Sequence, residues 1–248
     1  MFILSFLFFI TAILYSSVGF GGGSTYLALL LIWEVPYYIF PIIALTCNVI
    51  VVSGNCFNYI RAGNYKLNLL YPFLLGSIPF SYIGGSLTIQ KEIFELLLFI
   101  ILTIAGLLLL VNNKSYSEKK LKIKKLNLII SISIGSILGL ISGIIGIGGG
   151  IFLSPILFLL KAEKPKYIAT TASLFILINS VSGIFGQLTK ENLLGNLINY
   201  WPLFICVFIG GFIGNYLNIK FFSSRVMAIM TSLLVIFVSI RMGFKLFL

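Results

Sequence analysis

The chain has 248 residues, of which 59% are hydrophobic and only 9% are charged, and its formal net charge is +11. Soluble domains carry about 25% charged residues, so this composition excludes an ordinary soluble protein. A membrane-spanning helix needs about 20 apolar residues. Runs without Asp, Glu, Lys or Arg cover 1–33, 35–60, 67–90, 96–113, 126–160, 167–189, 192–219 and 226–240. We therefore predict an all-α polytopic membrane protein.

The first run contains a glycine cluster that should interrupt its helix. Four glycines fall within the five residues Gly19-Phe20-Gly21-Gly22-Gly23. Glycine costs about 1 kcal/mol relative to alanine inside a helix, so the helix is expected to break here. Broken backbone at membrane depth survives only where it is buried in protein or lines a wet cavity. The run has no basic start and no small-residue cleavage site, so we predict a retained span and not a signal peptide.

The same pattern returns at 146–150 as Gly-Ile-Gly-Gly-Gly, 127 positions later. Other matches follow at a similar offset, because Pro72 corresponds to Pro202 and Gly84 to Gly214. Paired helix breaks in repeated halves point to the binding site of a secondary transporter. We therefore predict two homologous membrane repeats, each with a glycine-broken helix, over 1–112 and 126–248, joined by a basic linker over 113–125.

The residues after each break suggest what is bound. A helix that starts just after a glycine turn presents free N–H groups and the positive end of its dipole, which together attract anions. Ser24 and Thr25 are also candidate caps of the first new helix. Polar side chains gather in the next run of each half, where the alternative is that they only hold helices together. The predicted substrate-binding residues are Gly21, Gly22, Gly23, Ser24, Thr25, Thr46, Asn48, Gly148, Gly149, Gly150, Thr170, Thr171 and Ser173.

The linker indicates how the chain is oriented. Six lysines crowd it: Lys114, Lys119, Lys120, Lys122, Lys124 and Lys125. A basic block beside membrane spans is typical of the cytoplasmic side, and we prefer this interpretation to nucleic-acid binding. We expect a multi-pass protein of the cell inner or plasma membrane with a cytoplasmic linker. The expected partners are the lipid bilayer and a small anionic substrate; assembly into a homo-oligomer stays open.

Two arrangements of membrane crossings are compatible with the sequence. The glycine-bearing runs, 1–33 and 126–160, hold 33 and 35 residues, which as straight helices would be about 50 Å long. If each run crosses once, eight segments form parallel repeats and the Lys and Arg residues divide 11 to 6 between the two sides. If each run folds back at its glycines, ten segments form inverted repeats and the division becomes 13 to 4. The sharper division favours inverted repeats.

The missing residue types exclude several functions. The chain has no histidine, and its three cysteines form no paired motif, so we predict no metal site and no cofactor. It has no aspartate, and its six glutamates lie at run boundaries or in loops. The usual intramembrane proton relay is therefore not expected. Neither is an enzyme, because the polar spans offer no obvious general acid or base.

The two glycine breaks resemble those of the TauE/SafE sulfite exporter family, the TSUP-type anion transporters. The stretches Ile151-Phe152-Leu153-Ser154-Pro155 and Ala169-Thr170-Thr171-Ala172-Ser173-Leu174 carry the resemblance further. The first half departs from it, since Ala28 stands where the second copy has a proline. The resemblance implies a secondary transporter or exporter of small anions, such as sulfite or sulfonate-type organosulfur anions, by alternating access. The alternative is a non-transporting membrane assembly partner or an intramembrane enzyme in which the glycines only pack.

Overall fold

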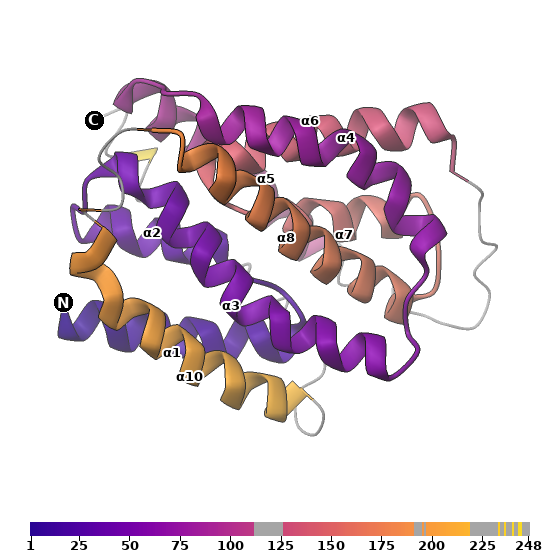
Figure 1. The fold of residues 1–248 in the computed structure, drawn as a ribbon, viewed down its shortest axis with the longest axis horizontal. Coiled ribbons are helices and arrows are strands. Elements are labelled where there is room, and N and C mark those ends of the chain that lie inside the picture. The colour runs from indigo at the N-terminus through magenta and orange to yellow at the C-terminus, as the bar shows by residue number, and fades with distance from the viewer. Residues whose placement is uncertain are drawn as a thin grey trace.

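In the computed structural model of the chain, the described residues are 1–111, 126–190 and 197–218, with residues 195, 233, 236, 240, 243 and 244. Every regular element within them is a helix, so the predicted all-α class is confirmed there (Figure 1). The basic linker, with its six lysines, lies outside the described residues.

The helices follow the apolar runs of the sequence. Those of the first half are α1 (Phe2–Val18), α2 (Gly23–Ile32), the short 3-10 helix η1 (Tyr37–Ile39), α3 (Phe40–Arg61), α4 (Leu67–Ser86) and α5 (Lys91–Val111). Those of the second half are α6 (Leu128–Ile145), α7 (Gly150–Leu159), α8 (Pro165–Gln187), η4 (Ile198–Tyr200) and α10 (Trp201–Asn218). Prolines in the first turn of α3 and α8 favour a helix start, because they fix φ where no N–H partner is needed.

Helix length separates two kinds of segment. Among the described residues, five helices are long and apolar enough to cross a membrane, spanning Tyr37–Arg61, Leu67–Ser86, Leu128–Ile145, Lys166–Gln187 and Ile198–Tyr216. The helices α2 and α7 have ten residues each, or about 15 Å, which is half of a bilayer core. The chain therefore contains full-length spans together with two half-length helices that directly follow the glycine clusters.

Glycines bring α4 and α6 together at backbone distance. Gly135, Gly139 and Gly143 repeat every four residues along α6, and an added Cβ on each would collide with a carbonyl oxygen of α4. The carbonyls in question belong to Phe73, Ser77 and Ser81. Small residues at such spacing let membrane helices approach closely, since apolar lipid gives no hydrophobic drive for helix association. The two helices consequently run side by side (Figure 1).

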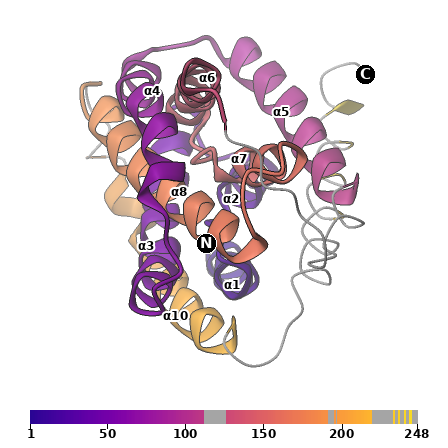
Figure 2. The ribbon, with the colours of Figure 1, turned by 90° about the vertical axis from the view of Figure 1, so that its right-hand side faces the viewer.

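The pair α1 and α10 is built in the same way. Gly210 lies against the carbonyl of Phe9, and Gly214 against the carbonyl of Ile13. Helices α3 and α8 pack on each other between the two pairs, because α8 also contacts α4 and α6 while α3 also contacts α10. Figure 2, which looks along most of the helices, shows this order from α4 and α6 at the top to α1 and α10 at the bottom.

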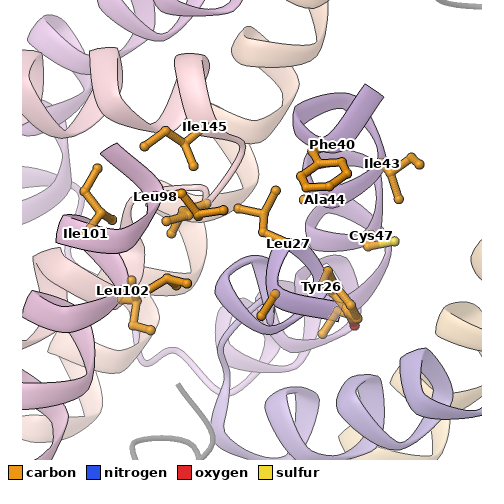
Figure 3. Packing of buried hydrophobic residues seen from close by; sticks show 14 of the residues in the cluster. Tyr26, Leu27, Phe40, Ile43, Ala44, Cys47, Leu98, Ile101, Leu102 and Ile145 are labelled. Atoms are coloured by element: carbon orange, nitrogen blue, oxygen red, sulfur yellow. The ribbon is translucent and has the colours of Figure 1, made fainter. Parts of the chain in front are cut away.

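The two short helices lie inside the molecule. All residues from Gly23 to Leu30 are buried, as are those from Gly150 to Pro155. Side chains of α2, α3, α5 and α6 meet in the core beside them, as Figure 3 shows. Large apolar side chains on outward faces, such as Phe208 and Phe212 of α10, are exposed, as suits a surface in contact with lipid. The half-length helices are thus covered by the full-length ones.

Candidate functional site

The first glycine cluster forms a turn that reverses the chain. Gly19 and Gly22 have φ values of 84° and 89°, which residues with a side chain rarely adopt. The ring centroids of Phe8 in α1 and Tyr26 in α2 are 4.7 Å apart. In one straight helix these two residues would be separated by about 27 Å, at 1.5 Å per residue. Helix α2 therefore folds back along α1.

The second cluster forms a corresponding turn. Gly146, Gly148 and Gly149 have φ values of 95°, 84° and 74°. A Cβ on Gly149 would lie 3.4 Å from the carbonyl oxygen of Leu138, a residue two turns before the end of α6. Helix α7 therefore starts beside α6 and not beyond it. Both glycine-bearing runs contain a long helix, a tight turn and a buried half-length helix.

Each half-length helix begins with unpaired backbone donors. Within the described part of the chain, the amides of Gly23 and Ser24 in α2 have no acceptor, and neither do those of Gly150 and Ile151 in α7. The next amides bond back to the carbonyls of the preceding glycines. Free N–H groups and the positive dipole end therefore coincide at both helix starts, which is the arrangement that favours an anion.

The predicted capping by Ser24 and Thr25 is wrong. The N-cap of α2 is Gly22, and no side chain accepts a hydrogen bond from the amides of the first turn. The two hydroxyls instead share hydrogen bonds with the hydroxyl of Tyr15 in α1, at 3.4 Å for Ser24 and 2.6 Å for Thr25. Tyr15 is within reach because the chain reverses, which brings the end of α1 over the start of α2.

The two breaks meet at the side chain of Asn48 in α3. Its Nδ2 donates to the carbonyl of Ile147 at 3.1 Å and, less closely, to that of Gly146 at 3.4 Å. A Cβ on Gly23 would lie 2.7 Å from the Ile147 oxygen and 2.8 Å from Asn48 Nδ2, and a Cβ on Gly148 would lie 2.8 Å from the same nitrogen. Only glycine leaves room at these positions. The structure thus brings together Gly21, Gly23, Asn48 and Gly148.

A second side chain makes the reciprocal contact. Ser173 in α8 donates from Oγ to the carbonyl of Gly19, the residue that caps the end of α1, at 2.5 Å. Helix α3 of the first half therefore reaches the second break through Asn48, and helix α8 of the second half reaches the first break. The carbonyls of Gly19, Gly146 and Ile147, at the two breaks, accept hydrogen bonds from polar side chains of the opposite half, which meets the need of buried backbone for partners.

Two buried polar atoms at this centre have no partner within the described residues. They are Oδ1 of Asn48, which lies against Gly21, and Oγ of Ser180, which lies 3.1 Å from the position of a Cβ on Gly148. Both residues are 0% exposed. A buried polar atom without a hydrogen bond costs about 1–3 kcal/mol, so such atoms call for a functional explanation.

The other predicted site residues make different contacts. Thr46 and Thr170 donate to carbonyls one turn back in their own helices, at 2.7 Å and 3.0 Å. Thr171 is buried in α8. Gly149 lies near Phe175 and Gly150 near Ile176, while Gly22 lies between the rings of Tyr15 and Tyr26, as the added-Cβ positions indicate.

Sequence reasoning missed two polar residues near the breaks, Tyr15 and Tyr59, and noted Ser180 only as one of the polar side chains in the run 167–189. Tyr15 bonds the start of α2, Ser180 lies beside Gly148, and the hydroxyl of Tyr59 would be 2.5 Å from a Cβ on Gly19. Tyr59 stands four residues after Asn55, which itself stands seven after Asn48, so all three share a helical face. This spacing could have identified Tyr59 as a residue on the same face as Asn48.

An ion pair joins two loops at the end of the molecule where α6 starts. Lys66, before α4, and Glu163, before α8, are in contact at 2.5 Å, with side-chain exposures of 45% and 8%. Burial acts to raise the pKa of Glu163, but hydrogen bonds from Lys66 and the Lys164 amide, with the charges of both lysines, hold that pKa below its usual value. Both partners line a cavity of about 750 Å³ that Leu126 also lines.

Buried half-length helices that meet at a polar centre are typical of polytopic membrane transporters. A model of the sulfite exporter TauE/SafE family matches residues 4–242, so the chain belongs to this family and is a membrane transporter of that type. The predicted resemblance is thereby confirmed.

Relatives support the same class. The chain is 26% identical over 228 residues to the "Probable membrane transporter protein y4hK" of Sinorhizobium fredii (strain NBRC 101917 / NGR234), which covers 92% of both chains. It is 40% identical over 52 residues to a "Probable membrane transporter protein" of Haemophilus influenzae (strain ATCC 51907 / DSM 11121 / KW20 / Rd), covering 21% of this chain and 19% of that protein. No solved structure matches the chain.

Proposed function

We propose that the chain is a secondary transporter or exporter of small anions, namely sulfite or sulfonate-type organosulfur anions, and not an enzyme. The anion binds between the starts of α2 and α7 and is exposed to each side of the membrane in turn. The observation that carries this proposal is the meeting of two buried helix starts, each with two unpaired amides, at the side chain of Asn48.

The groups at this centre can bind an anion without a charged side chain. Backbone amides supply the positive end of two helix dipoles, and Ser180 has a hydroxyl that can donate a hydrogen bond. No carboxylate lies among the described residues around the breaks, so no negative charge opposes the anion. An oxyanion with several acceptor oxygens can take bonds from both helix starts at once.

We also propose inverted repeats with ten membrane segments and a cytoplasmic linker. The ion pair supports this, because it places Glu163 at the same end as Lys66 and as Leu126, where the linker ends. In the eight-segment alternative, α6 and α7 together would form one crossing and Glu163 would lie at the opposite end. The backward fold of α2 and of α7 supports the same choice.

The paired glycine contacts support the duplication. Gly84 of α4 lies against the carbonyl of Leu140 in α6, and Gly214 of α10 lies against the carbonyl of Ile13 in α1. Leu140 and Ile13 are 127 positions apart, and Gly214 and Gly84 are 130 apart. Helix α4 of the first half therefore pairs with α6 of the second half, and α10 of the second half pairs with α1 of the first. Rocking of these two pairs about α3 and α8 would expose the central anion to alternate sides.

Flux measurements on purified protein in liposomes test the proposed activity. We expect uptake of sulfite or methanesulfonate above that of protein-free liposomes. Ser180→Ala should lower apparent affinity by roughly two- to twelvefold, because it removes one hydrogen-bond donor worth about 0.5–1.5 kcal/mol. The matched control is Ser86→Ala, since Ser86 is only partly buried and its hydroxyl bonds to the Ile83 carbonyl within α4. Flux equal to that of empty liposomes for every small anion would exclude the proposed function.

Cysteine labelling of intact cells tests the topology. Lys120→Cys and Lys164→Cys, in a background without Cys47, Cys56 and Cys206, should both be shielded from a membrane-impermeant reagent until the cells are opened. Lys91→Cys should be labelled at once, because Lys91 begins α5 at the other end of the molecule. Labelling at position 164 in intact cells, with position 120 shielded, would establish the eight-segment arrangement instead.

A further inference from the structure

A second polar cavity lies at the end of the molecule opposite the ion pair. We name it the outer cavity; its volume is about 280 Å³, and it is lined by Lys190, Tyr37, Tyr38, Pro41 and Ile144, together with residues 87–89 and Phe94. Lysine, threonine and tyrosine supply its polar atoms, and most of the remaining wall is aliphatic or aromatic. The wall is therefore amphipathic, with one cationic group.

The outer cavity adjoins the second glycine break. Pro41, in its wall, lies directly against Gly146, because a Cβ on that glycine would be 2.6 Å from the Pro41 Cα and 2.8 Å from its carbonyl oxygen. Ile144, also in the wall, precedes Gly146 by two residues. One layer of residues thus separates the outer cavity from the break.

Lys190 is held in place by a chain of hydrogen bonds. Its Nζ donates to Oε1 of Gln187 at 2.9 Å, and Nε2 of the same glutamine donates to the carbonyl of Gly143 in α6 at 2.9 Å. Within the described residues, Lys190 has no carboxylate partner. Burial lowers the pKa of Lys190 to about 8, so the group is still mostly protonated at pH 7. A cation that has no carboxylate partner among the described residues, and that stands in a partly buried wall, attracts an anion.

We propose that the outer cavity is a second anion site, which binds small organic anions bearing a short hydrocarbon chain. Lys190 pairs with the anionic group, and the apolar wall covers the hydrocarbon. Ligand pockets for drug-sized molecules measure about 300–1,000 Å³, so this cavity suits a ligand of only a few heavy atoms. A bare inorganic oxyanion would leave the apolar wall without contacts. Passage of the ligand onward to the break rests on the proposed function, whereas its binding here does not.

A homologous series of ligands tests the site. Binding of methane-, ethane-, propane- and butanesulfonate to the purified full chain is measured by calorimetry, with sulfate for comparison. We expect affinity to rise up to about fourfold for each methylene that becomes buried. Lys190→Met should weaken the binding of all four sulfonates at least tenfold, while Lys190→Arg, which keeps the charge, should largely preserve it. Affinity that is independent of chain length, or unchanged in Lys190→Met, would overturn the proposal.

Two further variants keep the test decisive. Lys91→Met is the matched control, because Lys91 lies at the same end but lines a different cavity, with Glu34 and Glu95. The Lys91→Met variant should bind the sulfonates as tightly as the wild type does. If Lys190→Met fails to fold, Leu87→Trp fills the cavity from its rim without removing the charge. It should abolish the dependence on chain length, and persistence of that dependence would count against the site.

Flux separates this proposal from the proposed function. Sulfonate binding that depends on Lys190, in a protein without anion flux, would support the outer cavity and reject transport. Anion flux with no effect of Lys190→Met on binding or transport would reject the outer cavity and leave the central site intact.

Discussion

Replacing Gly23 by alanine tests whether the two breaks touch. The new Cβ would lie 2.7 Å from the Ile147 carbonyl oxygen, 3.0 Å from the Ile147 Cα and 2.8 Å from Asn48 Nδ2, whereas ordinary contacts begin at 3.4 Å. Two of these atoms belong to backbone and cannot rotate away. Gly23 has no positive φ, and alanine is the better helix former, so the backbone of α2 itself accepts the change. The effect therefore reports the contact between the breaks.

Overpacking of this kind costs about 1–3 kcal/mol. If contact between the breaks belongs to one state of the transport cycle, that penalty changes the ratio of the two states by about 5- to 150-fold. We expect the initial rate of anion flux in liposomes, at equal protein density, to fall at least fivefold. Gly195→Ala is the control, because a Cβ there would have no atom within 4 Å. A wild-type rate in Gly23→Ala would refute the contact as the basis of the site.

Two further predictions concern ionisable groups at the two ends. The carboxylate of Glu163 has a lowered pKa, so its pairing with Lys66 stabilises the fold above the usual carboxyl pKa and is lost as pH falls through the lowered value. Glu163→Gln should remove this acid-dependent part of thermal stability, about 1 kcal/mol or less for a partly exposed pair; an unchanged acid profile would contradict it. At the other end, sulfonate affinity should fall as pH rises through about 8, since Lys190 loses its proton there. Lys190→Arg should abolish that fall, because guanidinium stays charged; the other ionisable residues of the wall are Tyr37 and Tyr38.

The breaks could be located from sequence because their cause is local. Gly19, Gly22, Gly146 and Gly149 all have positive φ in the structure, and glycine is the residue that adopts this conformation without strain. The all-α class followed from composition for a similar reason, since each uncharged run is long enough to form a helix in lipid. Helix breaks and the all-α class can thus be predicted from sequence, because they depend on local backbone chemistry and on hydropathy and not on tertiary contacts.

The contacts at the centre could not be predicted, because they join distant residues. Asn48 and Ile147 are 99 positions apart, and Ser173 and Gly19 are 154 apart. The failed capping prediction has the same origin: Tyr15 takes the hydroxyl of Thr25 only because the chain reverses. Spacing identified Asn48 as a polar residue of an apolar helix, but only packing shows which backbone it reaches.

Helix α5 is longer than the uncharged run that it contains. The sequence places Glu95 at the boundary of that run, which begins at residue 96. In the structure α5 begins at Lys91, so Glu95 lies within its second turn and is only 8% exposed. Charged residues are tolerated in the first turns of a membrane helix, where acidic groups also meet the positive end of the dipole. Counting uncharged residues alone therefore shortens such helices.

The central claim is that the meeting point of the two breaks binds an anion, and Asn48→Asp tests it most directly. The two side chains have the same shape, but aspartate places a negative charge beside both helix starts and removes the donor to the Ile147 carbonyl. At an effective dielectric constant of 20, two charges 4 Å apart repel by about 4 kcal/mol, which is close to a thousandfold in affinity. The control is Asn64→Asp, the same change in the loop after α3. We predict that Asn48→Asp abolishes anion flux in liposomes while Asn64→Asp preserves it; wild-type flux and affinity in Asn48→Asp would contradict an anion site at the breaks.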